Sequence, residues 1–208
     1  ISNDTEIRDL IHLSKLFQNN TTIFILDKIV KKGLISLKIN LHFDKDGKIQ
    51  DNYKVNGLIK NTNLKLLKKQ SIEDLNFEFD IKKEEYLIKN LKSKYKKIYL
   101  SSNSIIINEK NKFFFIKGDI KNINKNLDNE VLNFLSNNYF KKFKINQISL
   151  TTDNLFSFKI NKEFKFNELN VSSKIKLDNL NYEFENNEIK KYIPDYKDLI
   201  QLSNHNLN

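Results

Sequence analysis

The sequence predicts a mainly β protein, a long ladder of antiparallel strands with one or two short helices. Three observations lead to this fold class. Apolar residues occupy every second position in several segments, as at Leu37, Ile39, Leu41 and Phe43. Polar turn sequences separate these segments, and one nine-residue pattern occurs twice, with its glycines 61 residues apart. A period of two indicates strands with one apolar face, and repetition indicates a ladder of similar strands.

The first elements are predicted to be a helix and three strands. Leu10, Leu13 and Leu16 have helical spacing, which predicts a short helix over 9–17. The apolar, β-branched stretch 21–30 predicts a strand, and the alternating stretch 37–43 predicts the next one. The polar turn sequence 44–47 ends that strand. We expect a return strand over 48–60, in which Gly57 marks a bulge or a close approach of the backbone.

The middle of the chain continues as a meander of strands. In the stretch 75–81, Leu75, Phe77, Phe79 and Ile81 fall on one face. Polar turns are predicted at 82–85 and 109–111. The strands predicted here cover 64–67, 75–81, 86–91, 98–107 and 112–123.

A helix is predicted near 127–138, because Leu127, Val131 and Phe134 share one helical face and Asp128 is placed to cap the start. The stretch 187–202, which holds Pro194, is predicted to be a short helix or loop. We expect one elongated domain over 1–208, with sub-units 20–125 and 145–185 on either side of the helix near 127–138. The strands predicted after this helix cover 145–150, 155–160, 164–171 and 175–184.

Repeated motifs support the ladder. Gly57 and Gly118 each stand in a strand-like pattern and are each followed by x-Ile-Lys-Asn. The sequence Leu-Asn-Phe-Glu-Phe at 75–79 recurs as Leu-Asn-Tyr-Glu-Phe at 180–184. A unit of apolar-x-apolar followed by two hydroxyl residues appears at 98–102, 148–152 and 169–173. These units indicate that similar strands recur along the chain.

Composition limits the classes of function. The chain has no cysteine, which excludes disulfides and thiolate metal sites. The formal net charge is +10, but the basic residues are nearly all lysines scattered among acids, and Arg8 is the one arginine. The arginine forks that bind phosphate and guanine edges are therefore missing. We therefore expect no nucleic acid as a partner. A basic nucleic-acid-binding β-domain is the least favoured of the three functions that we consider for this chain.

The sequence shows no set of residues that would act together in catalysis. It has no Gly-x-Ser-x-Gly motif and no glycine-rich phosphate loop. The acidic pair in the turn 44–47 lacks the distal glutamate of a calcium loop, so a plain turn is expected. We expect no enzyme activity, no cofactor and no metal ion. The three histidines, isolated in sequence and without metal-ligand spacing, are His12, His42 and His205.

With these motifs in place, the chain resembles a piece of an AsmA-like protein. This family includes the TamB group and belongs to the repeating β-groove, bridge-like lipid-transfer proteins. The resemblance is carried by Val55-x-Gly57 and Ile116-x-Gly118 with their following Ile-Lys-Asn. The alternating Leu-x-Phe-x-Phe strands and the apolar-x-apolar-Ser-Ser units also fit. The resemblance covers roughly 34–184 as a pattern of strands.

The resemblance implies that the strands form an elongated, twisted antiparallel β-sheet curled into an open groove. It also implies a periplasmic segment that is tethered to the inner membrane of a diderm bacterium. The segment would carry phospholipid acyl chains along its apolar side between the inner and outer membrane, without chemistry and with no catalytic residues to transfer from the family. The chain looks like an excised fragment, with its membrane anchor outside it and with other envelope proteins as further partners. The residues expected to line the lipid groove are Leu37, Ile39, Leu41, Phe77, Phe79, Phe156, Phe158 and Ile160.

Physical reasoning leaves alternatives open. An apolar sheet face must be covered by protein or by something else. If a second sheet covers it, the chain is a closed β-sandwich that acts as a structural or interaction module of a cell-envelope protein. If the face is open, hydrocarbon chains are a suitable occupant, since burying each CH₂ gains about 0.8 kcal/mol.

Overall fold

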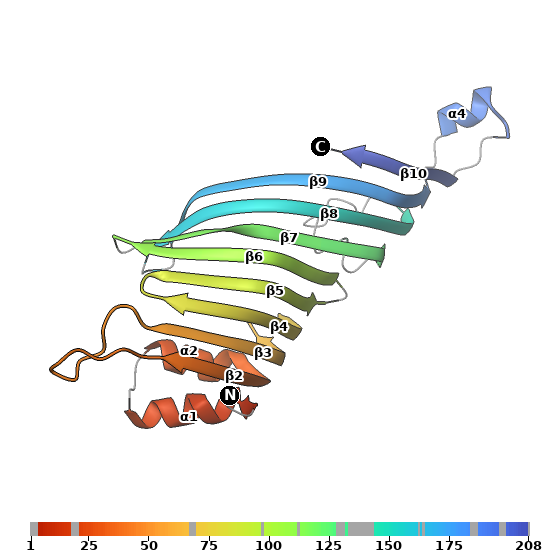
Figure 1. Ribbon diagram of the computed structural model, residues 1–208. Helices are drawn as coiled ribbons and strands as arrows, with labels where there is room; N and C mark the ends of the chain where they lie inside the picture. The colour runs from red at the N-terminus through yellow and green to blue at the C-terminus, as the bar shows by residue number, and fades with distance from the viewer. Residues whose placement is uncertain are drawn as a thin grey trace. The chain divides into compact units, whose positions relative to one another are not determined.

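The computed structural model describes residues 4–17, 21–66, 70–96, 98–111, 113–127, 132, 144–161, 163, 165–183, 187–195 and 199–207. Within them, the strands form one ten-stranded antiparallel sheet that is not closed into a barrel (Figure 1). The strands lie side by side in chain order, from β1 to β10. The fold class predicted from the sequence, mainly β with short helices, is therefore confirmed.

The strands are β1 (Thr5–Glu6), β2 (Val30–Asn40), β3 (Lys54–Lys65), β4 (Ser71–Lys82), β5 (Glu85–Tyr95), β6 (Ile98–Lys110), β7 (Phe113–Leu127), β8 (Lys144–Asn161), β9 (Phe166–Glu183) and β10 (Leu199–Leu207). The described helices are α1 (Ile7–Phe17), α2 (Thr21–Ile29) and α4 (Asn187–Tyr192).

Contacts between residues divide the chain into two compact units. Unit 1 comprises 1–120 and 155–172, and unit 2 comprises 121–154 and 173–208. The boundaries pass through β7, β8 and β9, which each contribute to both units. The sub-units expected at 20–125 and 145–185 stay a prediction.

The N-terminal elements are partly as expected. The helix predicted over 9–17 is α1, but the strand predicted over 21–30 is wrong, because this stretch forms α2 and only Val30 belongs to a strand. A short apolar run does not distinguish a strand from a buried helix by periodicity. Contacts with α1 decide for the helix, since Lys15 Nζ lies 2.8 Å from Asp27 Oδ2.

Several predicted strands are too short or begin in the wrong place. The return strand begins at Lys54 rather than 48, since 41–53 contains only the bridge between Phe43 and Ile49 around the expected turn. The two strands predicted over 145–160 are one strand, β8, and those predicted over 164–184 are one strand, β9. The polar break in β8 is bridged across strands, with Thr151 Oγ1 donating to Asp178 Oδ2 at 3.2 Å.

The C-terminal stretch contains a strand that the sequence analysis missed. The helix α4 agrees with the expectation for 187–202, but β10 follows it and pairs with 175–183 of β9. The helix predicted near 127–138 lies outside the described residues, except for Leu127, which ends β7, and Leu132, which is helical.

A line of β-bulges crosses unit 1. Asn61, Asp74 and Asn90 have φ angles of 48°, 50° and 53° on three successive strands, and the pairing register shifts at β3–β4 and β4–β5 near them. Side-chain amides occupy the gaps in the ladder: Asn61 N donates to Asn76 Oδ1 at 2.9 Å. Asparagine and aspartate tolerate this left-handed conformation better than other residues with side chains. Bulges at matching places bend the strands together.

The core is small in the part of the chain that the structure describes. Ile11 of α1 and Val30 at the start of β2 are buried. Gly33 has a φ of 150°, and a Cβ there would lie 2.8 Å from Thr62 Cβ and 2.9 Å from Ile7 Cδ1, so glycine leaves room for the side chain of Thr62 on β3 and for that of Ile7 on α1. The remaining buried apolar side chains among the described residues are Ile59, Ile98, Leu127, Leu132, Ile145 and Ile148.

Candidate apolar binding face

The pairing registers of β2 to β6 place apolar side chains in rows across one side of unit 1. Directly paired residues of an antiparallel sheet point to the same face. Starting from β2, the register runs from Ile39 to Val55 and Ile81, and from Leu37 to Gly57 and Phe79. A third row pairs Ile35 with Ile59 and Phe77. We call this set the apolar face; its members are Ile35, Leu37, Ile39, Val55, Gly57, Ile59, Phe77, Phe79, Ile81, Tyr86, Ile88, Ile105 and Ile107.

The apolar face is not sealed as a core. Ile59 is buried, whereas Ile39 is 54% exposed, and all the other members are half-buried. A side chain in a close-packed interior would be almost fully removed from solvent. The apolar face therefore has room for contact with an additional apolar partner.

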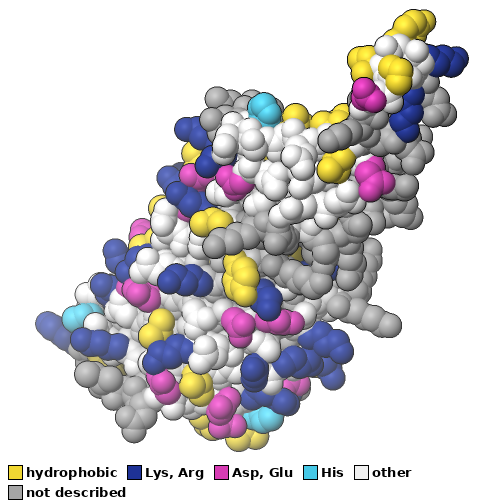
Figure 2. Space-filling view, turned by 90° about the vertical axis from the view of Figure 1, so that its right-hand side faces the viewer, with side chains coloured by type: hydrophobic (Ala, Val, Ile, Leu, Met, Phe, Trp, Pro, Cys, Tyr) yellow, Lys and Arg dark blue, Asp and Glu magenta, His cyan; other side chains and the backbone are white. Residues whose placement is uncertain are grey.

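The opposite side of the same strands is mostly polar. Leu58 is paired with Glu78 and then Lys89, so the side chains next to the apolar residues carry charge. Lys89 Nζ lies 2.6 Å from Asp80 Oδ2, and the hydrogen bond to Asp80 raises the pKa of Lys89. Figure 2 shows basic and acidic side chains interspersed on the side of the molecule that it presents. The two faces of β2 to β6 thus differ sharply in chemistry.

Aromatic rings form part of the apolar face. The rings of Phe77 and Phe79 on β4 have their centroids 6.1 Å apart at 55°. Tilted pairs at this distance are favourable beyond the area that they bury. The rings give a broad surface at the centre of the face with no polar atom to satisfy.

A second aromatic cluster lies on the β8 and β9 parts of unit 1. The rings of Phe156 and Phe158 stack with centroids 5.8 Å apart, and Phe166 lies 5.4 Å from Phe158. Ile160 follows on the same face of β8 by alternation. These side chains of β8 are half-buried.

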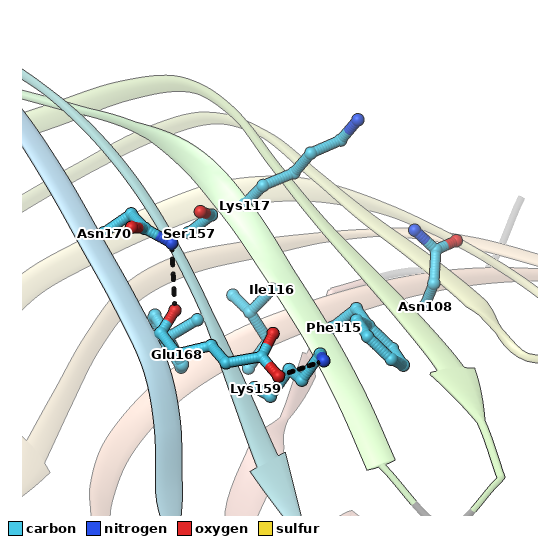
Figure 3. Close-up of a pocket in the computed structure, with 9 residues that line it drawn as sticks. Asn108, Phe115, Ile116, Lys117, Ser157, Lys159, Glu168 and Asn170 are labelled. Carbon is cyan, nitrogen blue, oxygen red and sulfur yellow. Dashed lines mark hydrogen bonds and ion pairs between the residues drawn. The ribbon is translucent and has the colours of Figure 1, made fainter.

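A shallow pocket of about 290 Å³ adjoins this second cluster (Figure 3). Lys159 carries an ion pair with Glu168, and its Nζ lies 5.1 Å from the ring centroid of Phe115. Asn170 Nδ2 donates to the backbone oxygen of Glu168 at 3.2 Å. Because the ammonium of Lys159 is already engaged on both sides, the pocket does not present it as a free cation.

The structure brings together half of the residues that the sequence analysis expected in a groove. Leu37, Ile39, Phe77 and Phe79 belong to the apolar face, while Leu41 lies beyond the end of β2. The other three, Phe156, Phe158 and Ile160, share one face of β8. The assignment of all eight to a lipid groove stays a prediction.

Sequence reasoning missed more than half of the apolar face. The signal was present, since Ile105 and Ile107 alternate just as Leu37 and Ile39 do. It was obscured by Ile106, which makes 105–107 a continuous apolar run with no visible period. The register of β5 with β6 shows which face each isoleucine occupies, because Ile105 pairs with Ile88 and Ile106 pairs with Leu87.

Neither metal nor membrane-span geometry is found in the described part of the chain. Among those residues, no group of three or more His, Asp or Glu side chains is placed to hold a metal ion. No described helix combines the length and the apolar character needed to cross a bilayer. The expectation of a chain without enzyme activity, cofactor or metal stays a prediction.

Comparison with known proteins gives no match. No family model matches the chain, no curated protein matches it, and no solved structure matches it.

Proposed function

We propose that the apolar face binds the acyl chains of phospholipid, and that the chain is a segment of an AsmA-like carrier that moves lipid between two membranes without chemistry. The observation that supports this function is the set of three registered apolar rows, most of whose side chains are half-buried rather than sealed. A face of this kind requires an apolar cover.

The dimensions of the face suit a hydrocarbon chain. A row that crosses five strands spans four intervals of about 4.8 Å, or about 19 Å. One leaflet of a bilayer has a hydrocarbon thickness of about 15 Å, which is the length over which an acyl chain lies in the membrane. One row can therefore accommodate an acyl chain along most of its length.

The energetics favour binding of an acyl chain without fixing its position along the face. If one side of roughly ten methylenes loses contact with water, the gain is about 4 kcal/mol at half of 0.8 kcal/mol for each. Since all rows are apolar, a displaced methylene meets another apolar side chain. A lipid can then move along the face with little change in free energy. The periplasmic location, the inner-membrane tether and envelope-protein partners are proposed with this function on the resemblance alone.

Site-specific photocrosslinking tests the proposal. A photoreactive amino acid at Ile105 should label phospholipid in cells, because Ile105 belongs to the apolar face. The same amino acid at Ile106 is the matched control, since Ile106 is also half-buried but points to the opposite side. Equal labelling at the two positions, or labelling at neither, would refute the proposal. Native mass spectrometry of detergent-free protein should show co-purified phospholipid.

A structural or interaction module is the second candidate function, and a different observation favours it. Among the described pairs of β9 with β10, none involves 166–174, so this stretch of β9 lacks β10 as a neighbour. Phe166, Leu169 and Val171 in it are exposed. Free edges of this kind accept strands from other chains. Light scattering that shows a dimer, lost on Val171→Pro, together with no bound lipid, would support this function instead.

A further inference from the structure

The helices α1 and α2 form a pair at the end of the sheet where β1 and β2 lie, in unit 1 (Figure 1). They are held together where Lys15 Nζ and His12 Nε2 lie 2.8 Å and 3.5 Å from the carboxylate oxygens of Asp27. One side of α1 packs against the sheet, with Ile11 buried and Ile7 and Leu10 half-buried. This side of α1 therefore contributes its apolar residues to the folded core.

The two helices also expose six large apolar side chains to solvent. Leu16 and Phe17 are each 80% exposed, which is far above the other apolar residues of α1. A helix that covers a sheet with one side normally presents polar residues on the other. Contiguous exposed apolar residues mark sites of interaction. We call this set the hairpin patch, and its members are Leu13, Leu16, Phe17, Phe24, Ile25 and Leu26.

The segment that carries the hairpin patch is basic. The segment 7–32 holds five basic residues and two acidic ones, a net charge of +3. One of the two acids, Asp27, is already paired with Lys15. The apolar and basic groups also touch, since Lys28 Nζ lies 5.4 Å from the ring centroid of Phe24.

We infer that the hairpin patch docks on the surface of an anionic phospholipid membrane. Helices that lie in a membrane interface combine exposed leucine and phenylalanine with lysine, so that rings enter the acyl boundary and ammonium groups meet lipid phosphates. The Phe24–Lys28 pair presents both groups at one point. A second copy of the chain would bring two positively charged patches together, so charge complementarity favours the anionic surface.

This inference goes beyond the proposed function and does not rest on it. Docking uses the hairpin patch, whereas acyl-chain binding uses the apolar face, which has no residue in common with it. Variants in one set should therefore leave the other property unchanged, and the two proposals can fail separately.

Vesicle flotation of the whole 208-residue chain tests the inference. The unmodified protein should float with vesicles of phosphatidylcholine and phosphatidylglycerol, and much less with phosphatidylcholine alone. The double variant Leu16→Ser, Phe17→Ser should lower the partition constant by about tenfold or more, since two large side chains no longer enter the interface. Lys28→Glu should weaken binding at least about fivefold on anionic vesicles only.

The control is Tyr192→Ser, which alters an 86% exposed aromatic residue of α4. It should float like the unmodified protein, and Ile105→Ser should also float normally while losing co-purified phospholipid. No flotation of the unmodified protein would overturn the inference, as would an equal loss with Tyr192→Ser. A dimer that forms without vesicles and dissociates on Leu16→Ser, Phe17→Ser would assign the hairpin patch to a second copy instead. Circular dichroism confirms that each variant is folded.

Discussion

The ring of Phe79 lies directly over Gly57, its partner on the neighbouring strand. A Cβ at Gly57 would lie 2.6 Å from Cε1 of Phe79 and 2.7 Å from the backbone oxygen of Ser36. The second glycine of the repeat is also closely approached by a neighbouring strand, since a Cβ at Gly118 would lie 2.7 Å from the backbone oxygen of Ser104 and 3.0 Å from Ile105 Cγ1. Of the two roles expected for Gly57, a close approach is therefore the correct one.

The contact predicts that Gly57→Ala destabilises the protein. The added methyl group must displace the ring of Phe79 and the strand that carries Ser36, which should cost about 1–3 kcal/mol. Urea denaturation measures the change. In a double-mutant cycle, Phe79→Ala should recover part of the cost of Gly57→Ala, because the contact with the Ser36 carbonyl remains. Strict additivity would show that the ring does not occupy this space.

The line of bulges predicts an unusual order of tolerance at Asn61. Its φ of 48° is left-handed, a conformation that glycine adopts without strain. Asn61→Gly should therefore leave the stability of the protein nearly unchanged or raise it slightly. Asn61→Val should cost about 1–3 kcal/mol, because a β-branched residue is strained in that region. Thermal denaturation of the two variants gives the comparison. If valine, the better strand former, stabilises the protein, the bulge is absent.

The sequence allowed the class of fold to be predicted but not its continuity. Alternation identified Leu37, Ile39, Phe77 and Phe79 correctly as sharing faces, since a period of two depends only on local geometry. It failed at 151–154, where four polar residues separated two predicted strands but belong to β8, with partners such as Asp178 on another strand. It also failed for α2, where contacts with α1 override the β-branched composition. Long-range pairing is the information that a single strand does not carry.

The pair of helices predicts a specific sensitivity to acid. The hydrogen bond from Lys15, with the charges of Lys15, His12 and Arg8, holds the pKa of Asp27 below its ordinary value of 3.8. The unfolded chain therefore binds a proton on this carboxylate more readily than the folded one does. The stability that the Lys15–Asp27 pair provides is complete when the pH is above the ordinary pKa of aspartate. It is lost as the pH falls through the lowered pKa of Asp27 in the folded protein.

We expect the melting temperature of the unmodified protein to fall more steeply below pH 3.8 than that of Asp27→Asn. Lys15→Gln should flatten the profile in the same way, because it removes the main cause of the lowered pKa. Calorimetry at a series of pH values measures the effect. Parallel profiles for all three proteins would mean that the pair does not persist in solution.

The last prediction compares two isoleucines of the same strand, β6. Ile98 is 5% exposed and belongs to the core, whereas Ile105 is half-buried on the apolar face. Ile98→Ala should cost about 2–5 kcal/mol, through lost burial and the cavity left behind. Ile105→Ala should cost clearly less, about 1 kcal/mol, because part of that side chain never left water. Urea denaturation of lipid-free protein separates the two values. Equal losses would mean that Ile105 is enclosed by protein in solution, and an enclosed face would have no place for an acyl chain.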